Sequence, residues 1–331
     1  MEINYWVLGI VIVLALSFDF INGFHDTANA IATSISTRAL TPKAAIILAA
    51  VMNFIGALLF SGVAETIGGS VANPMELDNG IPIVIATLIA AILWNLLTWW
   101  FGIPSSSSHA LIGALAGAVF IGAGPSMVNW RGFIGIVQAL IFSPLIGFGI
   151  GYAIMTILKW IFAKKNPHTV NKGFRTLQIF TAALQSFTHG TNDAQKAMGI
   201  ITFALVSARV QDHLEVPFWV KLSAATAIAL GSSVGGWKII KTMGTKLFKI
   251  EPINGFAADV TGASVIFSAT LLHLPVSTTH VITSAILGVG SAKRFSSVKW
   301  STAGQIVITW FITIPITATL AGLIFKLMFG W

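Results

Sequence analysis

Two short stretches place ionisable side chains inside long apolar runs. The first is Gly23–Ala30, of sequence GFHDTANA, and the second is Gly190–Ala197, of sequence GTNDAQKA. A carboxylate at bilayer depth costs roughly 3 kcal/mol unless it is paired or hydrated. Each aspartate therefore either joins helices by hydrogen bonds or belongs to a functional site. The recurrence of Gly-x-x-Asp in both stretches favours function.

Amides beside the two aspartates indicate a site for a small cation. Carboxylate and amide oxygens, with carbonyls freed at a helix break, are hard ligands that suit sodium, although a carboxylate alone could carry a proton. The candidate sodium ligands share such oxygens at membrane depth: Asp26, Asn22, Asn29, Asp193, Asn192 and Asn95. Asp19, two helical turns before Asp26, is interpreted as a satisfied core group.

A second pair of stretches, Pro104–Ser108 and Pro275–Thr279, places a proline and hydroxyls before an apolar segment. This pattern is typical of a helix N-terminus, where unpaired N–H groups and a partial positive charge suit an anion. Ordinary N-capping is the alternative interpretation. The candidate anion ligands are Ser105, Ser106, Ser107, Ser108, Ser277, Thr278, Thr279 and, one helical turn before His189, Gln185.

Charge balance links the two kinds of site. No arginine lies in these stretches, and Lys196, which takes the register position of Asn29, is their only lysine. An anion held there needs bound cations to neutralise it, so the pattern predicts cation–anion symport. Candidate gating or supporting residues are His109, His280, Asp259 and Lys196.

The composition predicts the elements that must position these residues. The chain has 331 residues, 55% hydrophobic and 9% charged, with a mean hydropathy of +0.85. Apolar runs of roughly 20 residues predict a polytopic α-helical membrane protein. Most basic residues fall in a few short loops, as the positive-inside rule predicts, so the net charge of +8 does not indicate a nucleic-acid partner.

Hydropathy divides the chain into apolar segments. Residues 5–37 exceed one crossing and are interrupted at 22–25, so a broken or bent helix is expected there. The remaining apolar segments are 44–63, 81–101, 106–121, 132–162, 177–206, 217–235, 255–273, 279–291 and 301–330. The limb pairs 81–121 and 255–291 each form either a re-entrant hairpin, which we favour, or two full crossings.

The two halves repeat one plan. Asp26 and Asp193 are 167 positions apart, whereas Pro104, His109, Gly117 and Pro144 each recur 171 positions later. Loop 65–80 is acidic and its counterpart 236–254 is basic, so the halves are expected to be inverted across the membrane. We predict a first repeat at 1–162, a linker at 163–176 inside the cell, a second repeat at 177–331, and both termini outside.

These motifs resemble the signature stretches of the PiT inorganic phosphate transporter family. The resemblance rests on Gly23–Ala30, Gly190–Ala194 and Pro275–His280 and covers almost the whole chain. It implies a bacterial symporter of inorganic phosphate with sodium or protons, an inverted-repeat fold and a homodimer in the cytoplasmic membrane. It places Asp26, Asn29 and Asp193 at positions that the family needs, and Asp259 at an acidic position important in eukaryotic members.

The sequence departs from the family pattern in ways that matter. His25 stands where the second motif has Asn192, and Gln195-Lys196 replaces Ala28-Asn29, so the two cation sites are not expected to be equivalent. The long hydrophilic central loop of eukaryotic relatives is absent. Regulation through that loop is therefore not expected.

Together, residues and resemblance predict an all-α polytopic membrane protein of two inverted-topology repeats, with broken helices and a re-entrant hairpin in each half. The expected function is sodium-coupled phosphate symport, with no cofactor. Proton-coupled symport, or transport of a metal–phosphate complex, is the alternative, and an anion channel is less favoured. An enzyme is not expected, because no arginine cluster, carboxylate cluster or closely spaced nucleophile–base pair is present.

Overall fold

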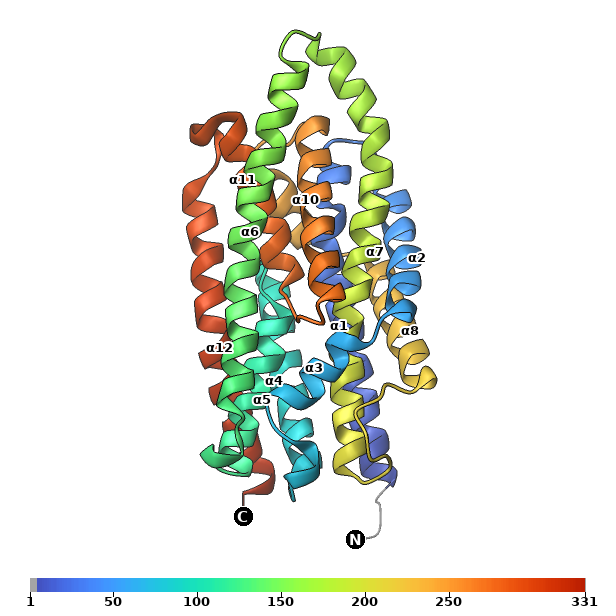
Figure 1. Cartoon of the computed structure of the whole chain (residues 1–331), viewed down its shortest axis with the longest axis vertical. Coiled ribbons are helices and arrows are strands. Elements are labelled where there is room, and N and C mark those ends of the chain that lie inside the picture. The colour runs from blue at the N-terminus through green and yellow to red at the C-terminus, as the bar shows by residue number, and fades with distance from the viewer. Residues whose placement is uncertain (1–4, 331) are drawn as a thin grey trace.

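The computed structural model describes residues 5–330, which fold as a long bundle of helices without a strand (Figure 1). The first half contains α1 (Tyr5–Ser36), α2 (Pro42–Leu59), α3 (Gly62–Ser70), η1 (Pro74–Glu76), α4 (Gly80–Phe101), α5 (Ser107–Gly122), η2 (Pro125–Met127) and α6 (Trp130–Phe162). The second half contains α7 (Pro167–Ser207), α8 (Phe218–Val234), α9 (Trp237–Lys241), η3 (Thr242–Lys246), α10 (Pro252–Leu271), α11 (Thr278–Arg294), η4 (Phe295–Ser297) and α12 (Trp300–Phe329).

Several of these helices are long and apolar enough to cross a bilayer. Within the described residues, five qualify alone, and α8 qualifies as a sixth when it is taken as one span with the segment Trp237–Lys246, to which it is bent by 62°. Large apolar side chains such as Leu145 and Phe311 are exposed on the outer helices, as lipid contact requires. The chain is therefore an integral membrane protein.

Of the broken or bent helix expected at residues 22–25, the break is wrong. α1 runs unbroken from Tyr5 to Ser36, and α7 is equally continuous through its own motif. No proline interrupts either motif, and the glycines serve close packing instead. A Cβ on Gly23 would clash with the backbone of α8, and one on Gly190 would clash with the backbone of α2.

Other expected loops are largely helical. α7 begins at Pro167, capped by Asn166, so most of the expected linker 163–176 belongs to this helix. α6 and α7 together extend beyond the rest of the bundle and join at its top (Figure 1). The expected basic loop 236–254 contains α9 and a short π-helix, and the acidic loop 65–80 contains most of α3.

Helix packing repeats between the halves. α1 packs on α8 as α7 packs on α2, and α5 packs on α12 as α11 packs on α6. Gly117 permits the close approach of α5 to α12, and its counterpart Gly288 does the same for α11 and α6. The sequence offsets therefore correspond to equivalent packing positions. The inverted orientation of the halves in the membrane stays a prediction.

Two helical hairpins meet inside the bundle. α4 and α5 lie in its lower part and α10 and α11 in its upper part, and the loop between α10 and α11 lies in the interior (Figure 1). The loops touch, because the Ser108 hydroxyl donates to the Val276 carbonyl at 2.8 Å. Each pair thus returns to the end of the bundle from which it came, which favours re-entrant hairpins over full crossings.

Candidate functional site

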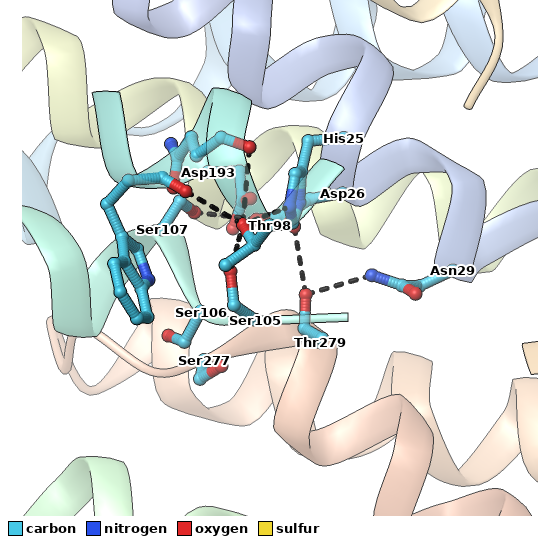
Figure 2. Close-up of polar contacts among 12 residues, drawn as sticks. His25, Asp26, Asn29, Thr98, Ser105, Ser106, Ser107, Asp193, Ser277 and Thr279 are labelled. Carbon is cyan, nitrogen blue, oxygen red and sulfur yellow. Dashed lines mark hydrogen bonds and ion pairs between the residues drawn. The ribbon is translucent and has the colours of Figure 1, made fainter. Parts of the chain in front are cut away.

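Asp26 is the point on which both hairpins converge. Its Oδ2 accepts a hydrogen bond from the Ser107 hydroxyl at 2.6 Å, and its Oδ1 accepts one from the Thr279 hydroxyl at 3.0 Å. His25 Nδ1 lies 2.6 Å from the same Oδ1. Figure 2 shows Ser107 and Thr279 on different helices near this carboxylate. One carboxylate therefore joins α1 to the first turns of α5 and α11.

The hairpin hydroxyls reach Asp26 because α5 and α11 begin at the loops. Ser106 caps α5 by accepting from the His109 backbone N–H at 3.1 Å, and Ser277 caps α11 by accepting from that of His280 at 3.2 Å. The first N–H groups of a helix have no intrahelical acceptor, and its N-terminus carries a partial positive charge. Two such ends facing one another form an environment suited to an anion.

Each motif contacts the hairpin of the other half. Asn29 Nδ2 donates to the Thr279 hydroxyl at 2.8 Å, as Figure 2 shows, and Lys196 Nζ donates to the Ser107 hydroxyl at 2.7 Å. Asn29 and Lys196 occupy the same register position in the two motifs. The two halves are therefore linked by matched but chemically different contacts.

Asp193 has different partners from Asp26. Its Oδ2 lies 2.9 Å from Lys196 Nζ and 3.2 Å from His189 Nε2, and all three side chains are buried. The neighbouring Asn192 points elsewhere and donates to the Thr270 hydroxyl and the Leu274 carbonyl. The expectation that the two cation sites differ agrees with this geometry.

Several predicted ligands present buried polar atoms that have no hydrogen-bond partner among the described residues. These atoms are both amide atoms of Asn22, Asn95 and Gln185, the Oδ1 atoms of Asn29, Asn192 and Asp193, and the Thr278 hydroxyl. Both carboxylate oxygens of Asp19 are in the same state, so its interpretation as a satisfied core group is wrong. Such groups are costly in a protein interior unless a ligand or water pairs with them.

The remaining hairpin residues support the tips. Ser105 donates to the Thr98 hydroxyl at 2.8 Å, and Thr98 lies 3.1 Å from His25 Nε2, so this pair orients the imidazole that faces Asp26. The His109 and His280 rings lie 4.4 Å apart between their centroids, and His280 stacks on Trp310 at 4.0 Å. These histidines join the two tips.

Asp259 lies in a separate polar cluster. Its carboxylate accepts from the Thr33 hydroxyl at 2.6 Å and from the Thr181 hydroxyl at 3.1 Å, which joins α10 to α1 and α7. Nearby, the Thr37 hydroxyl donates to Gln178 at 2.6 Å. The structure thus does not bring Asp259 to the hairpin tips.

Two features of the site were absent from the sequence predictions. One is Thr98. The other is Asn53, which donates to the hydroxyls of Thr27 and Ser232 at 2.9 Å each and meets His189 Nδ1 at 3.0 Å. A lone asparagine at the middle of the apolar α2 was the available signal for this network.

Comparisons with known proteins place the chain in a family. Residues 22–321 match the model of the phosphate transporter family. A probable low-affinity inorganic phosphate transporter of Bacillus subtilis (strain 168) is 58% identical over 320 residues, covering 96% of each chain. Another, from Rhizobium meliloti (strain 1021), is 48% identical and covers 95% of this chain and 94% of the relative.

A solved structure agrees with these matches. The chain superimposes on a protein described as "The sodium-dependent phosphate transporter" with a TM-score of 0.90 and 26% sequence identity, covering 97% of this chain and 98% of the other. The chain thus shares its fold, over nearly its full length, with a transport protein. With the family match over residues 22–321, this shows that the chain belongs to the phosphate transporter family and is a transporter, not an enzyme.

Proposed function

We propose that this chain is a symporter that carries inorganic phosphate across the membrane together with sodium ions. The observation that carries the proposal is the convergence of the Ser107 and Thr279 hydroxyls, from the N-termini of two opposed hairpins, on the buried carboxylate of Asp26. In this proposal the helix ends bind phosphate and Asp26 binds a coupling cation beside it.

Phosphate binds mainly through the hairpin tips. The hydroxyls and first N–H groups of Ser105–Ser108 and Ser277–Thr279 supply donors without a fixed positive charge. Gln185, whose buried amide lacks a protein partner, adds a further donor and acceptor. A polyanion held by neutral donors needs cations next to it, because the site is shielded from water.

Buried charge supports cation coupling. Among the described residues four carboxylates are buried, those of Asp19, Asp26, Asp193 and Asp259, but only one ammonium, that of Lys196. Phosphate adds more negative charge. Mobile cations must therefore enter with the anion, and a channel for bare anions would meet repulsion from these carboxylates.

Sodium is proposed over protons because of the oxygens around Asp26. The carboxylate, the unpaired Oδ1 of Asn29 and the hydroxyls of Ser107 and Thr279 are the hard ligands that sodium binds, whereas a proton needs only one oxygen. The sodium dependence stated for the structural neighbour agrees with this choice. Asn22 and Asn95, with unpaired amides, are further proposed sodium ligands, as are Asn192 and Asp193 of the second motif.

The proposed setting is a homodimer in the cytoplasmic membrane. The α6–α7 turn and the helix ends beside it carry Lys159, Lys164, Lys165, Lys172 and Arg175, so this end of the bundle faces the inside of the cell under the positive-inside rule. α1 begins and α12 ends at the opposite end of the bundle (Figure 1), so in the proposed orientation these ends face outside.

Uptake by purified protein in proteoliposomes tests the proposal, with sodium and pH gradients imposed separately. Uphill accumulation of phosphate driven by sodium alone is the expected result. Accumulation driven only by the pH gradient would replace sodium with protons, and a requirement for a divalent metal would identify a metal–phosphate complex as the substrate. Flux that only dissipates a phosphate gradient would indicate a channel and contradict symport.

A further inference from the structure

Lys196 is a lysine fully enclosed in the centre of a membrane protein. Its side chain is about 1% exposed and ranks among the largest buried side chains of the described residues. Its ammonium lies 2.9 Å from the Asp193 carboxylate and donates to the Ser107 hydroxyl at 2.7 Å. A charge buried at this depth persists only when it is paired and hydrogen-bonded, and both conditions are met.

The internal repeat shows what stands in this place in the other half. Asn29 occupies the same register position and donates to Thr279, just as Lys196 donates to Ser107. The Asn29 amide also keeps a buried oxygen, Oδ1, that has no hydrogen-bond partner among the described residues. At this register position the first motif thus has an amide oxygen that attracts a cation, whereas the second motif has the ammonium of Lys196, which is itself a cation.

We propose that the Lys196 ammonium is a resident cation that takes the place of one coupling ion in the second motif. Resting on the proposed function, this assigns the mobile sodium to Asp26 and a fixed positive charge to Asp193. Because Ser107 accepts from Lys196 and donates to Asp26, the fixed charge is also placed one hydroxyl away from the first site and at the N-terminus of α5.

A fixed charge at Lys196 changes the number of ions that the transporter must carry. A resident ammonium neutralises Asp193 in every step of the cycle and does not cross the membrane, so it contributes nothing to the coupled charge. A chain with a neutral amide at this position must recruit an additional cation to the Asp193 carboxylate, which keeps only the His189 imidazole beside it, because a buried charge without a counter-charge is costly. Lys196 therefore sets how many cations accompany each phosphate.

The test compares the sodium-to-phosphate ratio of the wild type with three substitutions in proteoliposomes, using radiolabelled sodium and phosphate. Lys196→Asn copies the amide of the first motif and is expected to raise the ratio by about one sodium per phosphate, because one buried charge loses its fixed partner. Lys196→Arg keeps the charge and is expected to keep the wild-type ratio. Lys196→Met removes the charge without offering an oxygen and is expected to lose most coupled uptake.

For a variant that folds but does not transport, the number of bound sodium ions is measured by equilibrium binding. Monodisperse Lys196→Asn protein is expected to bind one more sodium ion than the wild type, and Lys196→Gln provides the same test if the asparagine variant does not purify. An unchanged ion count in the neutral variants would overturn the inference. Lower phosphate affinity with an unchanged ratio would overturn it too, and would assign the ammonium to phosphate binding instead.

The outcome is separable from the failure of the proposed function. If wild-type uptake proves independent of sodium, sodium coupling fails, and the ratio is then measured with protons in the same set of variants. A difference of one proton per phosphate between wild type and Lys196→Asn would still support the resident cation. No difference for either ion would refute it.

Discussion

The hydroxyl of Thr279 offers a sharp test of how the hairpin tip supports the cation site. Thr279→Val keeps the shape of the side chain and removes only the hydroxyl. It deletes the hydrogen bond to Asp26 Oδ1 at 3.0 Å. It also leaves Asn29 Nδ2, which donates to this hydroxyl at 2.8 Å in the wild type, without its acceptor. Both lost contacts are buried.

The expected magnitude follows from those two contacts. A hydrogen bond to a charged group contributes about 1.5–3 kcal/mol, and an abandoned buried donor costs about 1–3 kcal/mol. Loss of the hydrogen bond to Asp26 is the contribution that weakens sodium binding. The sodium concentration for half-maximal uptake is therefore expected to rise roughly 10- to 100-fold. Maximal uptake at saturating sodium is expected to fall less.

Thr283 provides a matched control on the next turn of α11. Its hydroxyl donates to the Thr279 carbonyl within the same helix at 2.6 Å. That carbonyl belongs to the helical backbone, so Thr283→Val removes the same atoms without touching Asp26. The assay is a sodium titration of phosphate uptake in proteoliposomes with equal amounts of monodisperse protein. Equal sodium dependence of both valine variants would refute the assignment of Thr279 to the cation site.

Two further predictions concern hairpin chemistry and helix packing. Ser107→Ala removes the hydroxyl that links Lys196 to Asp26, so the half-maximal concentrations of both sodium and phosphate should rise by about tenfold or more. The Ser108 hydroxyl donates to the Val276 carbonyl, so Ser108→Ala should raise the half-maximal phosphate concentration and leave that of sodium nearly unchanged; an equal rise for sodium in both variants would contradict the site. Gly117→Ala forces a Cβ into the backbone of α12 and should destabilise the protein by about 1–3 kcal/mol, whereas a Cβ at the control position Gly135 meets open space. Thermal unfolding of both variants in detergent checks this prediction, and equal melting midpoints would argue against the packing.

Much of the fold follows from local sequence. Prolines and hydroxyls at Pro104–Ser108 and Pro275–Thr279 predicted two helix N-termini, and the structure caps both helices with a serine from these runs. Hydropathy located most of the long helices because apolar length is a direct requirement of the bilayer. These features depend on residues that are neighbours in the sequence, so one sequence is enough to predict them.

The failed predictions concern packing between distant segments. The polar interruption at residues 22–25 suggested a broken or bent helix, but the structure uses Gly23 and Gly190 for close contact with the backbone of another helix, which sequence does not place. The hydroxyls of Thr33 and Thr181 hold Asp259 apart from the hairpin tips, a position that sequence does not give, and its gating or supporting role stays a prediction.

The convergence of the hairpins also lay beyond the sequence. Ser107, Asp26 and Thr279 are widely separated along the chain, and only the interlocking of the halves brings their side chains together. The constant spacing between matching residues predicted the internal repeat, but it did not predict the contacts between the two halves. In the same way, the register predicted that Lys196 differs from Asn29, but its pairing with Ser107 required the position of α5.

The most direct test of the account is sodium-driven phosphate accumulation by Asp26→Asn in proteoliposomes. Asparagine keeps the size of the side chain and one acceptor oxygen, but removes the charge that Ser107 and Thr279 surround. At an effective dielectric constant of about 20, a unit charge ~4 Å from a cation contributes about 4 kcal/mol, or roughly a thousandfold in affinity. Folded Asp26→Asn protein is therefore expected no longer to accumulate phosphate uphill. Wild-type accumulation by this variant, at the wild-type sodium concentration, would contradict it.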